Sequence, residues 1–184
     1  MPLFTSRREK HLWLWTFAVV LAIFSTLFVG RPLAKLFSSQ DVQAVIFVLG
    51  MLLVGVTMLV HALKVKPGKM ELVLWLGITA VYAMFFLRLG LPERSHLIEY
   101  SVLAIFIHQA LTERRSQGKQ FGNPAIVALA LAFLIGLVDE CIQFSLPNRV
   151  FDPVDIFFNG MAATLAIGFA LGLGWVRKRL NREM

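Results

Sequence analysis

The chain has 184 residues, of which 58% are hydrophobic and 16% are charged. This composition excludes an ordinary soluble domain and indicates an integral membrane protein. The formal net charge is +7, but no stretch between the apolar runs is long enough to form a domain that presents a basic patch to nucleic acid. Nucleic-acid binding is therefore excluded, and the lipid bilayer is the expected partner.

Six apolar runs follow one another along the chain and predict an all-α fold. A helix needs about 20 residues to cross the hydrocarbon core of a bilayer. The runs are Leu12–Val29, Val42–Leu63, Leu72–Leu91, one that ends at Leu111, Ala125–Phe144 and Val154–Val176. The fourth run is strictly apolar only from Leu97 and reaches full length only if it begins at Pro92. The sequence predicts one integral membrane domain over residues 1–184, a polytopic bundle of six transmembrane helices.

Basic residues flank alternate ends of these runs unequally. One set of ends carries most of the 18 Lys and Arg residues, namely Arg7, Arg8, Lys10, Lys64, Lys66, Lys69, Arg114, Arg115, Lys119, Arg177, Lys178, Arg179 and Arg182. The opposite ends carry Arg31, Lys35, Arg88, Arg94 and Arg149. Because basic residues stay preferentially on the cytoplasmic side, we expect both termini in the cytoplasm and the protein in the plasma (inner) membrane.

Polar and ionisable residues gather at the ends of the last three runs that we expect to face outward. They form three clusters: Arg94-Ser95-His96-Leu97-Ile98-Glu99-Tyr100, then Asp139-Glu140-Cys141-Ile142-Gln143, then Arg149 with Asp152, Asp155 and Asn159. An ionisable group at the centre of a spanning helix costs roughly 2.5–3.5 kcal/mol on insertion scales. A chain that retains so many of them near the membrane is expected to use them, so these clusters predict a functional site at the outer leaflet.

The first cluster places three polar side chains on one helical face. His96, Glu99 and Tyr100 share that face, because successive residues turn by about 100° around a helix. A His and a Glu three residues apart can ligate a cation together or share a proton. The alternative is that His96 lies among the lipid headgroups and Tyr100 anchors the helix at the interface.

The second cluster places two adjacent carboxylates inside an apolar run. Asp139, Glu140 and Gln143 lie on one side of their helix, and Asp139 is about 7 Å from the end of the run at the helical rise. Each carboxylate must meet an arginine or a cation, or hold a proton. A purely structural alternative is a buried ion-pair network with Arg88 or Arg149 that fixes helix packing.

The third cluster begins the last predicted helix. Asp152 is expected as its N-cap, with Pro153 at the first helical position. Asp155 and the residue four positions later, Asn159, face the bundle, and Arg149 offers a bidentate donor to a carboxylate or phosphate. Small residues follow, namely Gly160, Ala162, Ala163, Gly168 and Gly172, and predict a close-packing surface that contains a small-residue association motif.

Taken together, the patterns resemble the VanZ-like family. They are Arg94-x-His96-x-x-x-Tyr100, Asp139-Glu140-x-x-Gln143, and Arg149 followed by Asp155-x-x-x-Asn159-Gly160. The resemblance covers about residues 88–173, whereas the first half matches only as generic spanning helices. Members of this family are small helical membrane proteins, and the founding ones are associated with low-level resistance to the glycopeptide teicoplanin. A family Lys near the His is Arg94 here. The resemblance implies a cell-envelope protein and supplies no reaction.

Three functions remain open at this point. The first is binding of a cell-envelope ligand, either a lipid-linked precursor headgroup or a glycopeptide. Its candidate ligand-binding residues are Arg94, His96, Glu99, Tyr100, Asp139, Glu140, Gln143, Arg149, Asp155 and Asn159. The second is an intramembrane enzyme that acts on a lipid headgroup, with His96 and Glu140 as acid and base or with a divalent cation on the carboxylates. The third is a proton- or cation-coupled transporter, which the position of the charges at one rim disfavours. No recognised catalytic motif is present, and no cofactor other than such a cation is expected.

Overall fold

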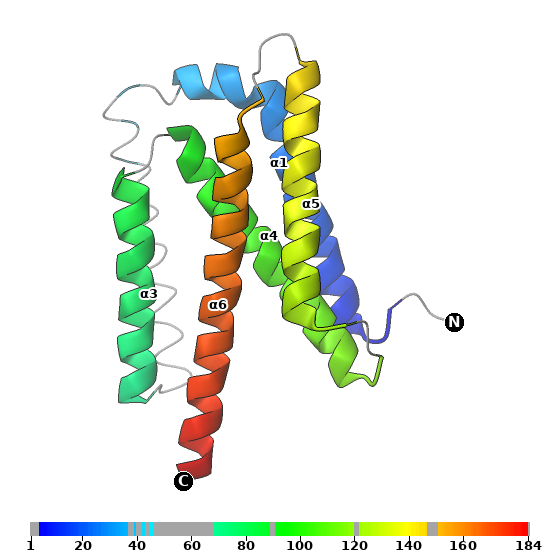
Figure 1. Cartoon of the computed structure of the whole chain (residues 1–184), viewed down its shortest axis with the longest axis vertical. Helices are drawn as coiled ribbons and strands as arrows, with labels where there is room; N and C mark the ends of the chain where they lie inside the picture. Colours follow the sequence, from blue (N-terminus) through cyan, green and yellow to red (C-terminus); the bar gives the residue numbers. More distant parts are fainter. Residues whose placement is uncertain are drawn as a thin grey trace.

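The structure, a computed structural model, is a bundle of long helices without strands in the part of the chain that it describes (Figure 1). It describes residues 4–36, 39, 42, 45, 68–88, 91–119, 122–146 and 151–183. The helices are α1 (Arg7–Leu36), α3 (Lys69–Arg88), α4 (Leu91–Ser116), α5 (Pro124–Ser145) and α6 (Pro153–Glu183). The all-α prediction is therefore confirmed. The expected span Val42–Leu63 lies outside the described residues apart from Val42 and Val45.

Both ends of the chain lie at one end of the bundle, which we call the terminal end (Figure 1). Ion pairs join helices there. Glu9 at the start of α1 pairs with Arg114 at the end of α4, Oε1 to Nε, at 3.3 Å. Glu71 at the start of α3 accepts a hydrogen bond from Nε of Arg177 on α6 at 2.8 Å. The two carboxylates are buried, with 0% and 4% of their surface exposed. The sequence analysis identified the basic residues at this end of the bundle. It did not identify Glu9 and Glu71 as their acidic partners.

Helix α4 runs obliquely through the centre of the bundle (Figure 1). It packs against α1, α5 and α6, and it contributes the largest part of the buried core. The core residues that it supplies are Leu97, Tyr100, Leu103, Ala104, Ile107 and Leu111. Because neighbouring helices cover one side of this helix, Tyr100 and Ser101 are buried against protein where they would otherwise face lipid.

Three of the described helical segments are long and apolar enough to cross a membrane. They are Arg7–Leu27, Pro124–Ser145 and Pro153–Arg179. The α4 helix is not among them, because polar residues such as His96, Glu99 and Gln109 interrupt its apolar sequence. The described residues therefore support a membrane protein with several spanning helices, and the count of six stays a prediction.

The α5 helix has its small and polar residues inside and its large apolar residues outside. Its buried face consists of Pro124, Ala128, Ala132, Gly136, Asp139, Glu140 and Gln143. The exposed residues include Ile126, Phe133, Leu134, Val138 and Phe144. This is the reverse of a surface helix in a soluble protein. It is typical of a helix in lipid, where apolar side chains gain nothing by moving inward and small residues allow close packing.

Polar caps fix the starts of the last two helices. The Asn123 side chain accepts a hydrogen bond from the Ala125 N–H at 3.0 Å, and Pro124 begins α5. The Asp152 side chain accepts from the Val154 N–H at 2.8 Å, directly before α6 begins at Pro153. The predicted cap at Asp152 is confirmed. It fixes the first turn of α6 at the end of the bundle opposite the termini, which we call the polar end (Figure 1).

The closest approach at a helical glycine in the described chain occurs at Gly136 on α5. A Cβ atom there would lie 3.1 Å from Nδ2 of Asn159 on α6 and 3.2 Å from Cε1 of Tyr100 on α4. The predicted association motif at Gly168 and Gly172 is wrong for contacts within the described chain, since a Cβ at either would meet no described atom within 4 Å. That motif depends on spacing alone, whereas the contact surface of α6 follows its buried alanines, Ala162 and Ala163.

We expect Gly136→Ala to destabilise the protein by about 1–3 kcal/mol, because the added methyl group overpacks a contact of three helices. Gly168→Ala is the matched control. It should be neutral or stabilise by up to about 1 kcal/mol, since alanine favours a helix and meets no neighbour. Thermal unfolding of the two purified variants in the same detergent measures the difference. Equal unfolding temperatures would contradict the close approach at Gly136.

Candidate functional site

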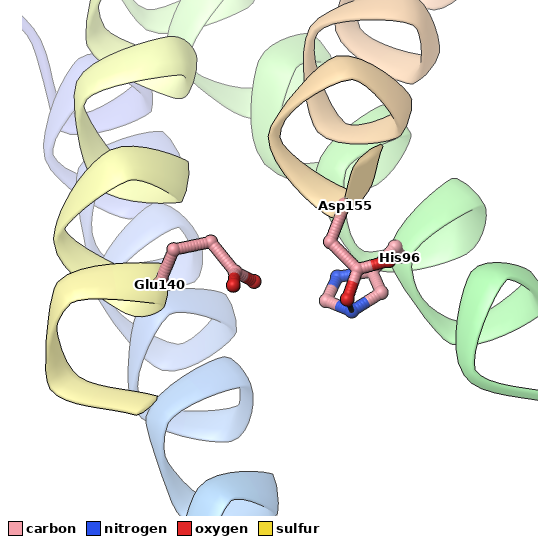
Figure 2. A group of neighbouring side chains, drawn as sticks. All are labelled: His96, Glu140 and Asp155. Atoms are coloured by element: carbon pink, nitrogen blue, oxygen red, sulfur yellow. Dashed lines mark ion pairs between the residues drawn. The ribbon is translucent and has the colours of Figure 1, made fainter. Parts of the chain in front are cut away.

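Three helices each contribute one side chain to a cluster at the polar end. His96 comes from α4, Glu140 from α5 and Asp155 from α6, and Figure 2 shows the Glu140 carboxylate directed toward the other two. One potential ligand atom from each residue lies within 4.8 Å of the others. His96 Nε2 is 3.7 Å from Asp155 Oδ2, and the two side chains are only 12% and 19% exposed. We call these three residues the triad.

The Glu140 carboxylate is held from two sides. The Gln143 side-chain amide, one helical turn further along α5, donates to Oε1 at 2.8 Å. The Asp152 backbone N–H, just before α6, donates to Oε2 at 3.2 Å. A carboxylate oxygen can accept two hydrogen bonds, so each oxygen of Glu140 has capacity for a further partner. These contacts orient a buried carboxylate toward the triad and also join the beginning of α6 to the end of α5.

A second group of polar side chains lies about one helical turn further into the bundle. We call it the deeper layer, and it consists of Tyr100, Asp139 and Asn159. The Tyr100 hydroxyl donates to Asp139 Oδ2 at 3.3 Å, and both residues are buried. Asn159 is 1% exposed, and neither polar atom of its side chain has a hydrogen-bond partner among the described residues. The His96 and Tyr100 rings, 6.0 Å apart between centroids, connect the triad to the deeper layer.

Negative groups outnumber positive groups among the described side chains of this site. Asp139, Glu140 and Asp155 supply carboxylates, and His96 is the one described group of the triad that can become positive. Buried carboxylates at such distances repel one another and lose their hydration. Carboxylate and imidazole atoms that converge in this way can bind a metal ion or accept hydrogen bonds from a positively charged group.

The structure brings together most of the residues that the sequence proposes for a site. His96, Tyr100, Asp139, Glu140, Gln143, Asp155 and Asn159 lie in the triad, in the deeper layer or in hydrogen bonds to them. Their role as ligand-binding residues stays a prediction. Arg149 lies outside the described residues, and for Arg94 only the helical backbone is described.

Two features of the site differ from what same-helix spacing suggests. One alternative from the sequence was that His96 acts with Glu99, but Glu99 is not part of the triad, and the described triad partners of His96 come from other helices. A residue that the sequence reasoning missed is Gly136, whose lack of a side chain makes room for Asn159 and Tyr100. The available signal was the run of small residues four apart, Ala128, Ala132 and Gly136, that leads to Glu140.

A helical bundle with lipid-facing apolar sides and a buried polar site at one end defines a multi-span integral membrane protein. The sequence matches the VanZ/LLP1 family over residues 10–175, and the chain belongs to this family. The match begins in α1, which corrects the narrower resemblance over residues 88–173 that the polar motifs suggested. No curated protein and no solved structure matches the chain.

Proposed function

We propose that this VanZ/LLP1 family protein binds a cell-envelope ligand at its polar end, which faces outward from the plasma membrane. The ligand is a lipid-linked precursor headgroup or a glycopeptide, and binding gives glycopeptide tolerance. The observation that carries the proposal is the convergence of buried polar side chains from α4, α5 and α6 at one end of the bundle. Buried ionisable groups in membrane proteins generally serve a function.

The chemistry of the site favours a ligand with a positively charged group. The triad and the deeper layer contain Glu140, Asp155 and Asp139, which accept hydrogen bonds from ammonium groups. Arg94 precedes these residues in the sequence, and Arg149 lies between Glu140 and Asp155. In this proposal the two arginines supply contacts to anionic groups such as phosphate.

The proposed topology has six spanning helices with both termini in the cytoplasm. Its support is that α1 begins, and α4 and α6 end, toward the terminal end of the bundle (Figure 1). The basic clusters at these three helix ends therefore lie toward the same side. Basic residues accumulate on the cytoplasmic side, so the polar end then faces the outer leaflet. The expected second span, Val42–Leu63, falls between α1, which ends at the polar end, and α3, which begins at the terminal end.

A second candidate function is an intramembrane enzyme that acts on a lipid headgroup. The observation in its favour is the ion pair of His96 and Asp155 at 3.7 Å, with Glu140 nearby. A carboxylate beside an imidazole can orient the ring for general acid–base catalysis. The same residues serve both candidates, and only the enzyme would change the lipid composition of the membrane.

Topology reporters test the orientation directly. Fusions after Lys66, Ser95, Gly118 and Pro147 should report inside, outside, inside and outside in turn, because each flanks a different proposed span. A reporter pair such as alkaline phosphatase and green fluorescent protein gives opposite readouts on the two sides. Two consecutive fusions on the same side would refute the six-span arrangement.

We expect Glu140→Gln to abolish tolerance in a glycopeptide-susceptible host that expresses the protein. The substitution keeps the size of the side chain and its capacity for hydrogen bonds but removes its charge, so folding should persist while ligand binding is lost. The minimum inhibitory concentration of teicoplanin should fall to the level of the empty vector. Glu113→Gln, which alters a carboxylate at the terminal end, is the matched control and should retain tolerance. Full tolerance in a folded Glu140→Gln protein would contradict the proposed role of this site.

A further inference from the structure

The spacing of the triad fits a bound metal ion. Ligand atoms at about 2.1 Å from a metal lie about 3.0–3.5 Å from one another. His96 Nε2 and Asp155 Oδ2 are already 3.7 Å apart, and all three ligand atoms fall within 4.8 Å. Small rotations of side chains close the remaining difference. We infer that His96, Glu140 and Asp155 bind one divalent metal ion, with Zn²⁺ the preferred species.

The donor set decides the class of metal. One imidazole nitrogen and two carboxylates suit zinc and neighbouring first-row divalent ions such as Mn²⁺. Ca²⁺ and Mg²⁺ prefer oxygen ligands only, so the imidazole disfavours them. Three protein ligands leave at least one coordination position open, as in zinc sites that bind a water or a substrate.

The environment of Glu140 resembles the support that metal ligands receive. Carboxylates that bind metals are commonly held by further hydrogen bonds, which fix their orientation. Glu140 accepts one such bond from the Gln143 side chain and another from the Asp152 backbone N–H. These donors come from two different segments, so the carboxylate is positioned before any ion arrives.

The charge of a divalent ion suits this donor set. Glu140 and Asp155 supply two carboxylates, and His96 supplies an imidazole. A divalent ion attracts both carboxylates, and the neutral imidazole is the form that binds metals.

Asn159 is an independent sign that something polar occupies this space. Its side chain is 1% exposed, and both of its polar atoms lack a hydrogen-bond partner among the described residues. It lies one turn beyond Asp155 on α6, with its amide nitrogen directed toward Gly136, one turn before Glu140 on α5. Leaving a buried amide unsatisfied costs about 1–3 kcal/mol. A buried water or a polar atom of a ligand would supply a partner.

This inference goes beyond the proposed function and does not rest on it, because metal binding can be measured without any envelope ligand. The protein is purified in detergent without a polyhistidine tag, stripped with a chelator and titrated with Zn²⁺ while binding heat is recorded. Elemental analysis after removal of free metal gives the stoichiometry. We expect about one zinc ion per chain. A stripped protein that takes up no zinc above the detergent blank would overturn the inference.

Variants distinguish specific zinc binding at the triad from nonspecific attraction of cations to an acidic surface. His96→Gln, Glu140→Gln and Asp155→Asn should each weaken zinc binding by at least about tenfold. Asp152→Asn is the matched control, because it removes a nearby exposed carboxylate while asparagine still caps α6. The control should bind like the parent chain. Equal weakening in all four variants would show nonspecific attraction and overturn the site.

A spectroscopic measurement on the unmodified chain covers the case in which a variant fails to fold. Co²⁺ replaces zinc in such sites and absorbs visible light strongly when only four or five ligands surround it. We expect a visible absorption band that zinc abolishes by competition. A spectrum identical to that of hydrated Co²⁺ would count against the triad as ligands.

Discussion

The close approach of three helices at Gly136 is the constraint on which the polar site depends. Tyr100 from α4 and Asn159 from α6 both lie against this glycine, closer than most side chains would permit. One turn further along α5 lies Glu140, which meets His96 and Asp155 from the same two neighbouring helices. If α5 stood further from α4 and α6, these polar groups would be separated and exposed to lipid. In hydrocarbon, each such exposed group costs several kcal/mol.

Lipid as the solvent explains why this bundle is arranged with its polar residues inside. Apolar side chains gain nothing by leaving hydrocarbon, so helix association relies on close packing and on polar contacts between helices. The chain concentrates these contacts at its two ends. The terminal end holds the ion pairs Glu9–Arg114 and Glu71–Arg177, where each carboxylate has a basic partner. The polar end holds the triad, whose carboxylates outnumber the one described imidazole. The first arrangement pairs opposite charges, and the second gathers carboxylates from two helices beside one imidazole.

The sequence predicts those features that depend on neighbours along one helix. The all-α class, the buried face of Asp139, Glu140 and Gln143, and the cap at Asp152 follow from helical periodicity and capping chemistry, and the structure agrees. Features that depend on how helices cross could not be predicted in this way. Same-helix spacing offered Glu99 as one partner for His96, and the enzyme alternative paired His96 with Glu140. The triad joins His96 to Glu140 and Asp155, which lie 44 and 59 positions further along the chain. The buried Glu9 and Glu71 were missed for the same reason, since their basic partners lie about a hundred residues further along the chain.

A disulfide between α5 and α6 tests the central claim, the close approach at Gly136, most directly. A Cβ atom at Gly136 would lie 3.3 Å from the Cβ of Asn159, near the separation that a disulfide requires. The chain has one native cysteine, so Cys141→Ser gives a clean background. In that background, Gly136→Cys with Asn159→Cys should form a disulfide on mild oxidation in native membranes. The control pair, Leu134→Cys with Asn159→Cys, should not, because Leu134 is exposed on the outer face of α5. Failure of the first pair, or equal reaction of both pairs, would contradict the account.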